Sequence, residues 1–214
     1  MRAMHDYYAA RAPEYDRIYQ KPERQADLRR IETWLTEALA GRSVLEVACG
    51  TGYWTQFYAP GATRVLALDA AAQTLQIARA RVPDKVQLIE GDAYAIPTVE
   101  APFEAAFAGF WWSHIPLDRI DPFLRGLHRA LQPGAKIIVL DNLFVPGSST
   151  PISARDAQGN SYQQRPLADG STHRVLKNFP TEAELLAAVA PHAQAATYRA
   201  WDYYWALEYT LATR

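Results

Sequence analysis

Short apolar runs that alternate with segments of helical pattern limit the fold of this chain more than any other feature. The apolar runs span 43–49, 64–70, 86–93, 103–110 and 136–142. The sequence predicts helices over 25–39, 53–58, 73–81, 122–131 and 181–190. Strands that alternate with helices form a mostly parallel sheet with helices on both faces. We therefore expect an α/β fold.

The segment 144–178 interrupts this alternation. It is polar and contains several prolines and glycines, and a stretch of this length without regular structure is usually a functional loop. A hairpin is expected around Ala168-Asp169-Gly170, and we predict that the segment is a substrate lid inserted between the fifth strand and the last helix. Thr181 and Glu184 form a helix-start pattern. The aromatic and β-branched tail, 195–212, predicts the last one or two strands.

The composition excludes several classes of protein. The chain has 214 residues, 49% of them hydrophobic, and a formal net charge of -1, which fits one globular domain over 1–214. No run of lysine and arginine indicates binding to nucleic acid or to an anionic membrane. A single cysteine, Cys49, excludes an internal disulfide framework. Because the sequence has neither a signal-peptide pattern nor an apolar stretch of about 18 residues, we expect a cytoplasmic protein.

The first motif with chemical meaning is the turn from Glu46 to Gly52, "EVACGTG", directly after the first predicted strand. Its glycines let the backbone turn sharply and let a ligand approach without a Cβ in the way. Thr55 stands where a dinucleotide fingerprint has its third glycine, and no Lys-Ser/Thr pair follows, so a pyrophosphate ligand is disfavoured. An ordinary tight turn explains this motif on its own equally well.

Two aspartates end the next two predicted strands. Asp69, at the end of "RVLALD", can accept hydrogen bonds from both hydroxyls of a ribose. Asp92, in "EGDA", can accept from the exocyclic amine of an adenine. For both residues, capping of the following helix is the simpler alternative. Open α/β sheets bind ligands at the carboxyl ends of their strands, so the glycine turn and the two aspartates together predict a nucleoside site.

These motifs resemble those of the class I S-adenosylmethionine (SAM)-dependent methyltransferases. "VLEVACGTG", "LALDAAAQTLQIAR", "VQLIEGDAYAIP", "FAGFWWSHIP" and "LHRALQPGAKIIVLDN" resemble successive motifs of that superfamily and cover about 42–142. The resemblance implies a three-layer sandwich with a mostly parallel seven-stranded sheet and an antiparallel last strand. It also implies SAM as cofactor and S-adenosylhomocysteine (SAH) as product.

The resemblance also assigns residues to the cofactor. Gly50 and Gly52 are expected beside the methionine part of SAM, and Asp69 at the ribose. Asp92 and the Ala93 amide are expected at the adenine. The full predicted cofactor set is Glu46, Ala48, Gly50, Gly52, Trp54, Asp69, Ala70, Asp92, Ala93, Phe110 and Tyr19.

The stretch "AFAGFWWSHIP" places aromatic residues and a histidine where the fourth strand ends. In this fold that strand end faces the sulfonium, a cation that aromatic faces attract. We therefore expect Phe110, Trp111 and Trp112 to form a cage or a substrate wall, and His114 to take a proton from the nucleophile. The alternatives are that at least one tryptophan packs in the core and that His114 shapes the turn before Pro116.

The N-terminal segment is rich in tyrosine and resembles the part of small methyltransferases that folds over the cofactor. We predict that 1–24 covers the cofactor, with Tyr15 or Tyr19 reaching the site and Tyr7 and Tyr8 as further candidates. The predicted catalytic set is His114, Trp111 and Tyr15. The spacing of the tyrosines also fits a helical stripe that packs on the core.

The function indicated by these patterns is SAM-dependent methyl transfer to a small molecule by in-line displacement, in a monomer or homodimer. No spacing of histidines suggests a metal site. One alternative keeps SAM but uses its aminobutyrate arm, by cyclisation or transfer, and releases methylthioadenosine. A second alternative is a SAM-binding sensor or partner protein without catalysis. The sequence does not identify the acceptor or its methylated atom.

Overall fold

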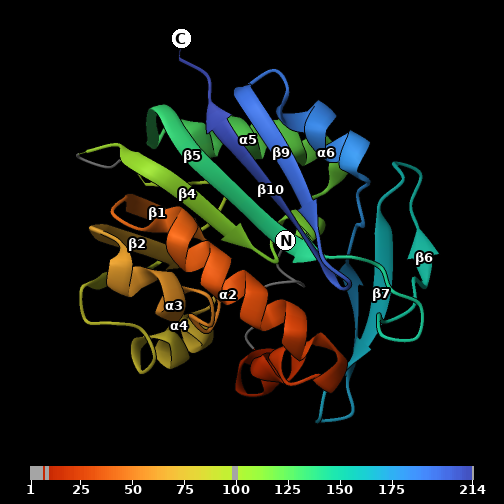
Figure 1. Cartoon of the computed structure of the whole chain (residues 1–214). Helices are drawn as coiled ribbons and strands as arrows, with labels where there is room; N and C mark the ends of the chain where they lie inside the picture. Colours follow the sequence, from red (N-terminus) through yellow and green to blue (C-terminus); the bar gives the residue numbers. More distant parts are fainter. Residues whose placement is uncertain (1–6, 8–9, 98–100, 214) are drawn as a thin grey trace.

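A seven-stranded sheet forms the centre of the computed structural model, which describes residues 7, 10–97 and 101–213 (Figure 1). The strand order is β3-β2-β1-β4-β5-β10-β9. The strands are β1 (Ser43–Val47), β2 (Arg64–Asp69), β3 (Val86–Glu90), β4 (Phe103–Gly109), β5 (Leu131–Asn142), β9 (Ala193–Ala200) and β10 (Tyr204–Leu211). β10 runs antiparallel to both of its neighbours, whereas the pairings among β1–β5 are parallel. The predicted fold class is confirmed.

Helices cover both faces of this sheet. One face carries α2 (Gln25–Leu39), α3 (Thr55–Tyr58) and α4 (Ala72–Arg79), and the other carries α5 (Ile120–His128) and α6 (Glu182–Val189). Successive strand residues point to opposite faces, so Val44 packs in the core beneath α2 while Leu45 packs in the core beneath α5. The sheet is thus buried on both sides, as its continuous apolar strands predict.

The segment between β5 and α6 contains a second, smaller sheet. Its antiparallel strands are β6 (Ala154–Arg155), β7 (Ser161–Pro166) and β8 (Thr172–Leu176). They stand beside the end of β5 in Figure 1. The predicted hairpin around 168–170 is therefore confirmed.

The boundaries of several elements differ from the prediction. The helix expected to end at Leu131 ends at His128, because β5 already begins at Leu131. In the N-terminal tyrosine segment, residues 12–19 form a 3-10 helix, η1 (Ala12–Tyr19). α6 starts with the expected capping box, in which Thr181 and Glu184 exchange side-chain to backbone hydrogen bonds. Within the described ranges, no helix is both long and apolar enough to span a membrane.

Candidate functional site

A cavity of about 580 Å³ opens at the carboxyl ends of β1, β2, β3 and β4. Backbone and small side chains form much of its wall. The sequence-predicted residues on this wall are Tyr15, Ala48, Gly50, Asp69, Ala70, Asp92, Ala93, Phe110, Trp111 and His114. The topology of the sheet therefore brings together most of the residues that the sequence analysis selected. We refer to this space, where the sequence analysis expects the cofactor, as the cofactor cavity.

The glycine turn after β1 is held by Asp69. One carboxylate oxygen of Asp69 accepts from the Gly50 amide at 2.8 Å, and the other accepts from the Ala71 amide at 2.9 Å. Gly50 adopts φ 56°, and Ala48 adopts φ 55°, although Ala48 is not a glycine. The Asp69 carboxylate thus fixes both the glycine turn and the start of α4 while it lines the cavity. Asp69 can therefore have the structural role at the start of α4 and the role of a ribose acceptor at the same time.

The far side of the cofactor cavity follows β3. Asp92 accepts a hydrogen bond from the Tyr94 amide at 2.9 Å. The Tyr94 ring packs at 5.7 Å from the Trp111 ring, and the Arg119 guanidinium lies 5.1 Å above Tyr94. Sequence analysis missed Tyr94 and Arg119, which both line the cavity. The position of Tyr94 two residues after Asp92 was the one signal that could have indicated it.

The aromatic run at the end of β4 divides between wall and core. Phe110 has φ 59°, a left-handed conformation that is unusual for a phenylalanine, and its ring lines the cavity together with Trp111. Trp112 is buried in the core beneath α5. The run therefore supplies two wall residues and one core residue.

Four residues of the predicted cofactor set do not line the cavity: Glu46, Gly52, Trp54 and Tyr19. Glu46 points into the core, where one carboxylate oxygen accepts from the Thr55 hydroxyl at 2.7 Å and the Tyr58 hydroxyl at 2.6 Å. Burial raises the pKa of Glu46 to about 7, although these two hydrogen bonds favour the ionised form. Glu46 thus ties β1 to α3.

The other three lie behind the wall. A Cβ on Gly52 would stand 2.8 Å from Val82 Cγ1, so this glycine allows the turn to pack on α4. The Tyr19 ring stacks on Tyr53 at 3.5 Å and lies 5.8 Å from Phe110, and Trp54 meets Phe110 edge-on at 5.8 Å. These rings support Phe110 from behind.

A second cavity, of about 260 Å³, adjoins the first, and we call it the polar chamber. The two share the wall residues Tyr15, Phe110 and His114. Charged residues on its wall are Arg11, Glu14, Arg17, Lys21, Arg24, Arg165 and Lys177. They come from η1 and the residue before it, from the chain between η1 and α2, and from the inserted segment. The charged part of the lining is therefore mostly cationic.

His114 is buried between the two cavities. Its Nδ1 lies 2.6 Å from the Leu176 carbonyl oxygen in β8, and because a carbonyl can only accept, Nδ1 carries the proton. Burial lowers the pKa of His114 well below its usual range, and the charges of Lys177 and Arg165 act in the same direction. His114 is therefore a neutral imidazole at neutral pH.

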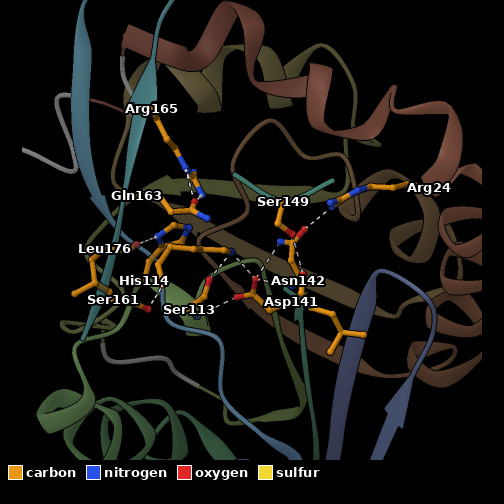
Figure 2. A network of polar contacts seen from close by, with 12 residues as sticks. Arg24, Ser113, His114, Asp141, Asn142, Ser149, Ser161, Gln163, Arg165 and Leu176 are labelled. Carbon is orange, nitrogen blue, oxygen red and sulfur yellow. Dashed lines mark hydrogen bonds and ion pairs between the residues drawn. The ribbon is translucent and has the colours of Figure 1, made fainter. Parts of the chain in front are cut away.

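A buried ion pair lies beside the polar chamber: Lys177 lines the chamber, and its partner Asp141 lies in the polar network of Figure 2. Lys177 Nζ lies 2.8 Å from a carboxylate oxygen of Asp141 and donates to the Ser113 hydroxyl at 2.6 Å. Burial lowers the pKa of Lys177 to about 8 although Asp141 favours its charged form. Burial opposes ionisation of Asp141, but the charge of Lys177 and the hydrogen bonds from Lys177 and from the Ser113 amide together lower the pKa of Asp141 to about 2. Both groups are charged at neutral pH.

Hydrogen bonds connect the N-terminal segment to the glycine turn and to the inserted hairpin. Asp16 accepts from the Thr51 hydroxyl of the glycine turn at 2.6 Å and pairs with Arg81. Glu14 accepts from the Ala168 amide of the inserted hairpin at 3.2 Å. This places Tyr15 over Gly50, whose Cβ position lies 3.9 Å from the Tyr15 ring. Tyr8, a further candidate, lies outside the described residues.

Comparisons with known proteins agree with this architecture. A family model described as a methyltransferase domain matches residues 44–134. The demethylmenaquinone methyltransferase of Renibacterium salmoninarum is 32% identical over 113 residues, which are 53% of this chain and 46% of that protein. The malonyl-[acyl-carrier protein] O-methyltransferase of Erwinia pyrifoliae is 32% identical over 148 residues, 64% of this chain and 53% of that protein. The chain thus spans about half the length of these curated relatives.

Solved structures match nearly the whole chain. A DhpI–SAH complex superposes with a TM-score of 0.78 and 27% identity, over 100% of this chain and 97% of that chain. A DhpI–SAM–HEP complex superposes with a TM-score of 0.79 and 26% identity, over 97% and 96%. With its sheet order, its strand-end cavity and these similarities, the chain belongs to the class I SAM-dependent methyltransferases.

Proposed function

We propose that this protein binds SAM in the cofactor cavity and transfers its methyl group to a small molecule in the polar chamber. The observation that carries this proposal is the junction of the two cavities at Tyr15, Phe110 and His114. A reaction between two bound molecules needs such a junction, because the nucleophile must lie against the methyl group for an in-line displacement.

The wall of the cofactor cavity supports this assignment. Asp69 would hold the ribose hydroxyls, Asp92 and the Ala93 amide the adenine, and Ala48 to Gly50 the methionine end. Phe110 and Trp111 would face the sulfonium, whose positive charge an aromatic face stabilises by about 0.5–2 kcal/mol. DhpI, which resembles this chain over nearly its whole length, has been solved with SAM and with SAH.

The chemistry requires little covalent help from the protein. A lone pair of the acceptor forms a bond to the methyl carbon while the carbon–sulfur bond breaks, and the released electron pair stays on sulfur to give SAH. Where the acceptor atom carries a proton, neutral His114 would receive it at Nε2, since Nδ1 donates to Leu176. In this proposal Tyr15 and Trp111 position the reactants.

The segments around the sheet would enclose the reaction. We propose that 1–24 covers the cofactor and that 144–178 is a lid over the acceptor. The hydrogen bonds from Asp16 and Glu14 to the glycine turn and to the inserted hairpin support this arrangement. The net charge of -1 favours a small acceptor over nucleic acid. A cytoplasmic location and a monomeric or homodimeric state stay predictions from the sequence.

The test is to incubate the purified protein with SAM, with and without a small-molecule extract of the source organism, and to resolve the nucleoside products by mass spectrometry. Extract-dependent SAH would support methyl transfer and would supply a fraction that contains the acceptor. Methylthioadenosine from SAM alone would favour use of the aminobutyrate arm. Tight SAM binding without either product would favour a sensor.

A further inference from the structure

We propose that the acceptor is a small oxyanion, such as a carboxylate, a phosphate or a phosphonate, and that Lys21, Arg24 and Arg165 bind its charged group in the polar chamber. This inference rests on the proposed function and names the substrate class of the same site. It is carried by cations that no described residue neutralises in an ion pair.

Arg24 is the strongest of these observations. Its side chain is only 6% exposed, yet its hydrogen bonds go to neutral oxygens, namely Asn142 Oδ1 at 3.1 Å and Ser148 Oγ at 2.9 Å. The guanidinium also lies 5.1 Å from the Tyr203 ring. No ion pair of Arg24 occurs within the described ranges. Since burial of an unpaired charge is costly, a bound anion would supply the missing countercharge.

Lys21 and Arg165 extend the same pattern. Lys21 Nζ donates to the Ser148 carbonyl oxygen at 2.6 Å, and burial together with the charge of Arg24 lowers the pKa of Lys21. Arg165 donates twice to the Gln163 amide oxygen, at 2.7 and 3.1 Å. Neither forms an ion pair with any described residue. Figure 2 shows Arg24 and Arg165 reaching toward the same polar network from opposite sides.

The carboxylates around the chamber are already engaged. Glu14 pairs with Arg17 at 2.8 Å, and Asp141 pairs with Lys177 at 2.8 Å. Glu23 is exposed and accepts from the Ser148 hydroxyl at 2.9 Å; its charge acts on Lys21 and Arg24, but it forms an ion pair with neither. The chamber therefore has an excess of positive charge that the described residues leave open.

The methionine carboxylate of SAM is a competing partner for these cations. It belongs to an amino acid end that also carries an ammonium group, so that end has no net charge. A zwitterion leaves most of the positive charge of Lys21, Arg24 and Arg165 uncompensated, whereas an anionic acceptor compensates it. Charge balance therefore favours the acceptor, and the experiment below separates the two partners.

The experiment measures anion binding by isothermal titration calorimetry to the protein saturated with SAH. The probes are methylphosphonate, inorganic phosphate and acetate, which separate tetrahedral from planar oxyanions. We expect saturable binding of at least one probe, weakened about 10-fold or more by Arg24→Gln and by Arg165→Gln, as for the loss of a charge-assisted hydrogen bond. Arg79→Gln is the matched control, because Arg79 is exposed and lines neither cavity.

The outcomes separate this inference from the proposed function. If SAH binds but no probe does, the oxyanion assignment is wrong while the cofactor assignment stands. If Arg24→Gln and Arg165→Gln weaken SAH instead, the cations serve the cofactor and the inference is also overturned. If SAH does not bind at all, the proposed function fails, and titration of the unliganded protein still decides whether the chamber binds oxyanions. Should Arg24→Gln not fold, Arg165→Gln and Lys21→Gln carry the same test from less buried positions.

Discussion

The cofactor cavity and the polar chamber meet at a shared wall, but different kinds of polar group line them. The cofactor cavity is formed where β1 to β4 end, and its fixed polar groups are backbone amides and the carboxylates of Asp69 and Asp92. The polar chamber is formed by long cationic side chains from the N-terminal region and the inserted segment. Sheet topology therefore determines the first, whereas individual side chains determine the second. Under the proposed function, a change of acceptor would require changes only in the polar chamber.

The largest effect is expected where the chamber depends on buried charge. Asp141→Ala leaves the buried Lys177 without its partner, so that Lys177 must keep an unpaired charge or give up its proton, and loss of one member of a buried pair typically costs about 3–5 kcal/mol. We expect that decrease in the free energy of unfolding, measured by urea denaturation. The double variant Asp141→Ala/Lys177→Met is the control and should recover most of the loss. A decrease below about 1 kcal/mol in the single variant would mean that the protein tolerates an unpaired lysine beside the chamber.

The contribution of Glu46, which lies beneath the cofactor cavity, to the free energy of unfolding should depend on pH. Its folded pKa of about 7 lies above the unfolded value of about 4.3. Between these two values the folded state holds the extra proton, so the stability contributed by Glu46 is complete below about pH 4 and is lost as pH rises through 7. The free energy of unfolding of wild type minus that of Glu46→Gln should therefore fall by about 3 kcal/mol between pH 4 and pH 8. A difference that stays constant with pH would contradict the raised pKa.

A third test separates chemistry from binding at the shared wall. His114→Ala should lower turnover by about 100-fold, within the range of general-base catalysis, while SAH affinity measured by calorimetry stays near that of wild type. His128→Ala is the control for loss of an imidazole outside both cavities. If His114→Ala turns over as fast as wild type, His114 takes no proton from the acceptor and is not a general base.

The smallest effect is expected for Asp69. Asp69→Ala removes the predicted ribose acceptor, and we expect SAH affinity to fall by about 1–3 kcal/mol, the range for a hydrogen bond to a charged group. Arg165→Gln should leave SAH affinity unchanged. Together the two variants would then assign SAH to the cofactor cavity, which Asp69 lines, and not to the polar chamber, which Arg165 lines. Calorimetric titration of both variants with SAH makes the comparison. An unchanged affinity in Asp69→Ala would remove Asp69 from the cofactor site.

The two cavities also differ in how much the sequence could predict. The glycine turn, Asp69 and Asp92 each end a strand that local pattern identifies, and parallel strands bring their ends together, so most of the cofactor wall could be predicted. The partners in the polar chamber are far apart in sequence. Arg24 and Ser148 are separated by 124 positions, and Lys177 and Asp141 by 36. No local pattern brings such residues together.

Glu46, Trp54 and Tyr19 show a second limit of sequence reasoning. Each stands next to the predicted site in sequence, yet each points into the core behind the wall. Position along a strand or a helix narrows the set of candidates, but packing decides which side chain faces the ligand. The same limit separates Trp111, on the wall, from Trp112, in the core.

The left-handed residues at the ends of β1 and β4 have a consequence for how this protein tolerates mutation. Ala48 and Phe110 both adopt positive φ angles, and a non-glycine residue in such a conformation costs about 1–3 kcal/mol. A glycine at position 48 would therefore raise thermal stability, whereas a glycine at position 110 would also remove the ring between the two cavities. At position 110, however, the buried ring packs on Tyr19, Trp54 and Tyr204, so its loss would cost more than the backbone conformation does. The two strained residues are thus expected to tolerate substitution differently: glycine at position 48 would raise stability, whereas at position 110 the ring contributes to stability as well as to the site.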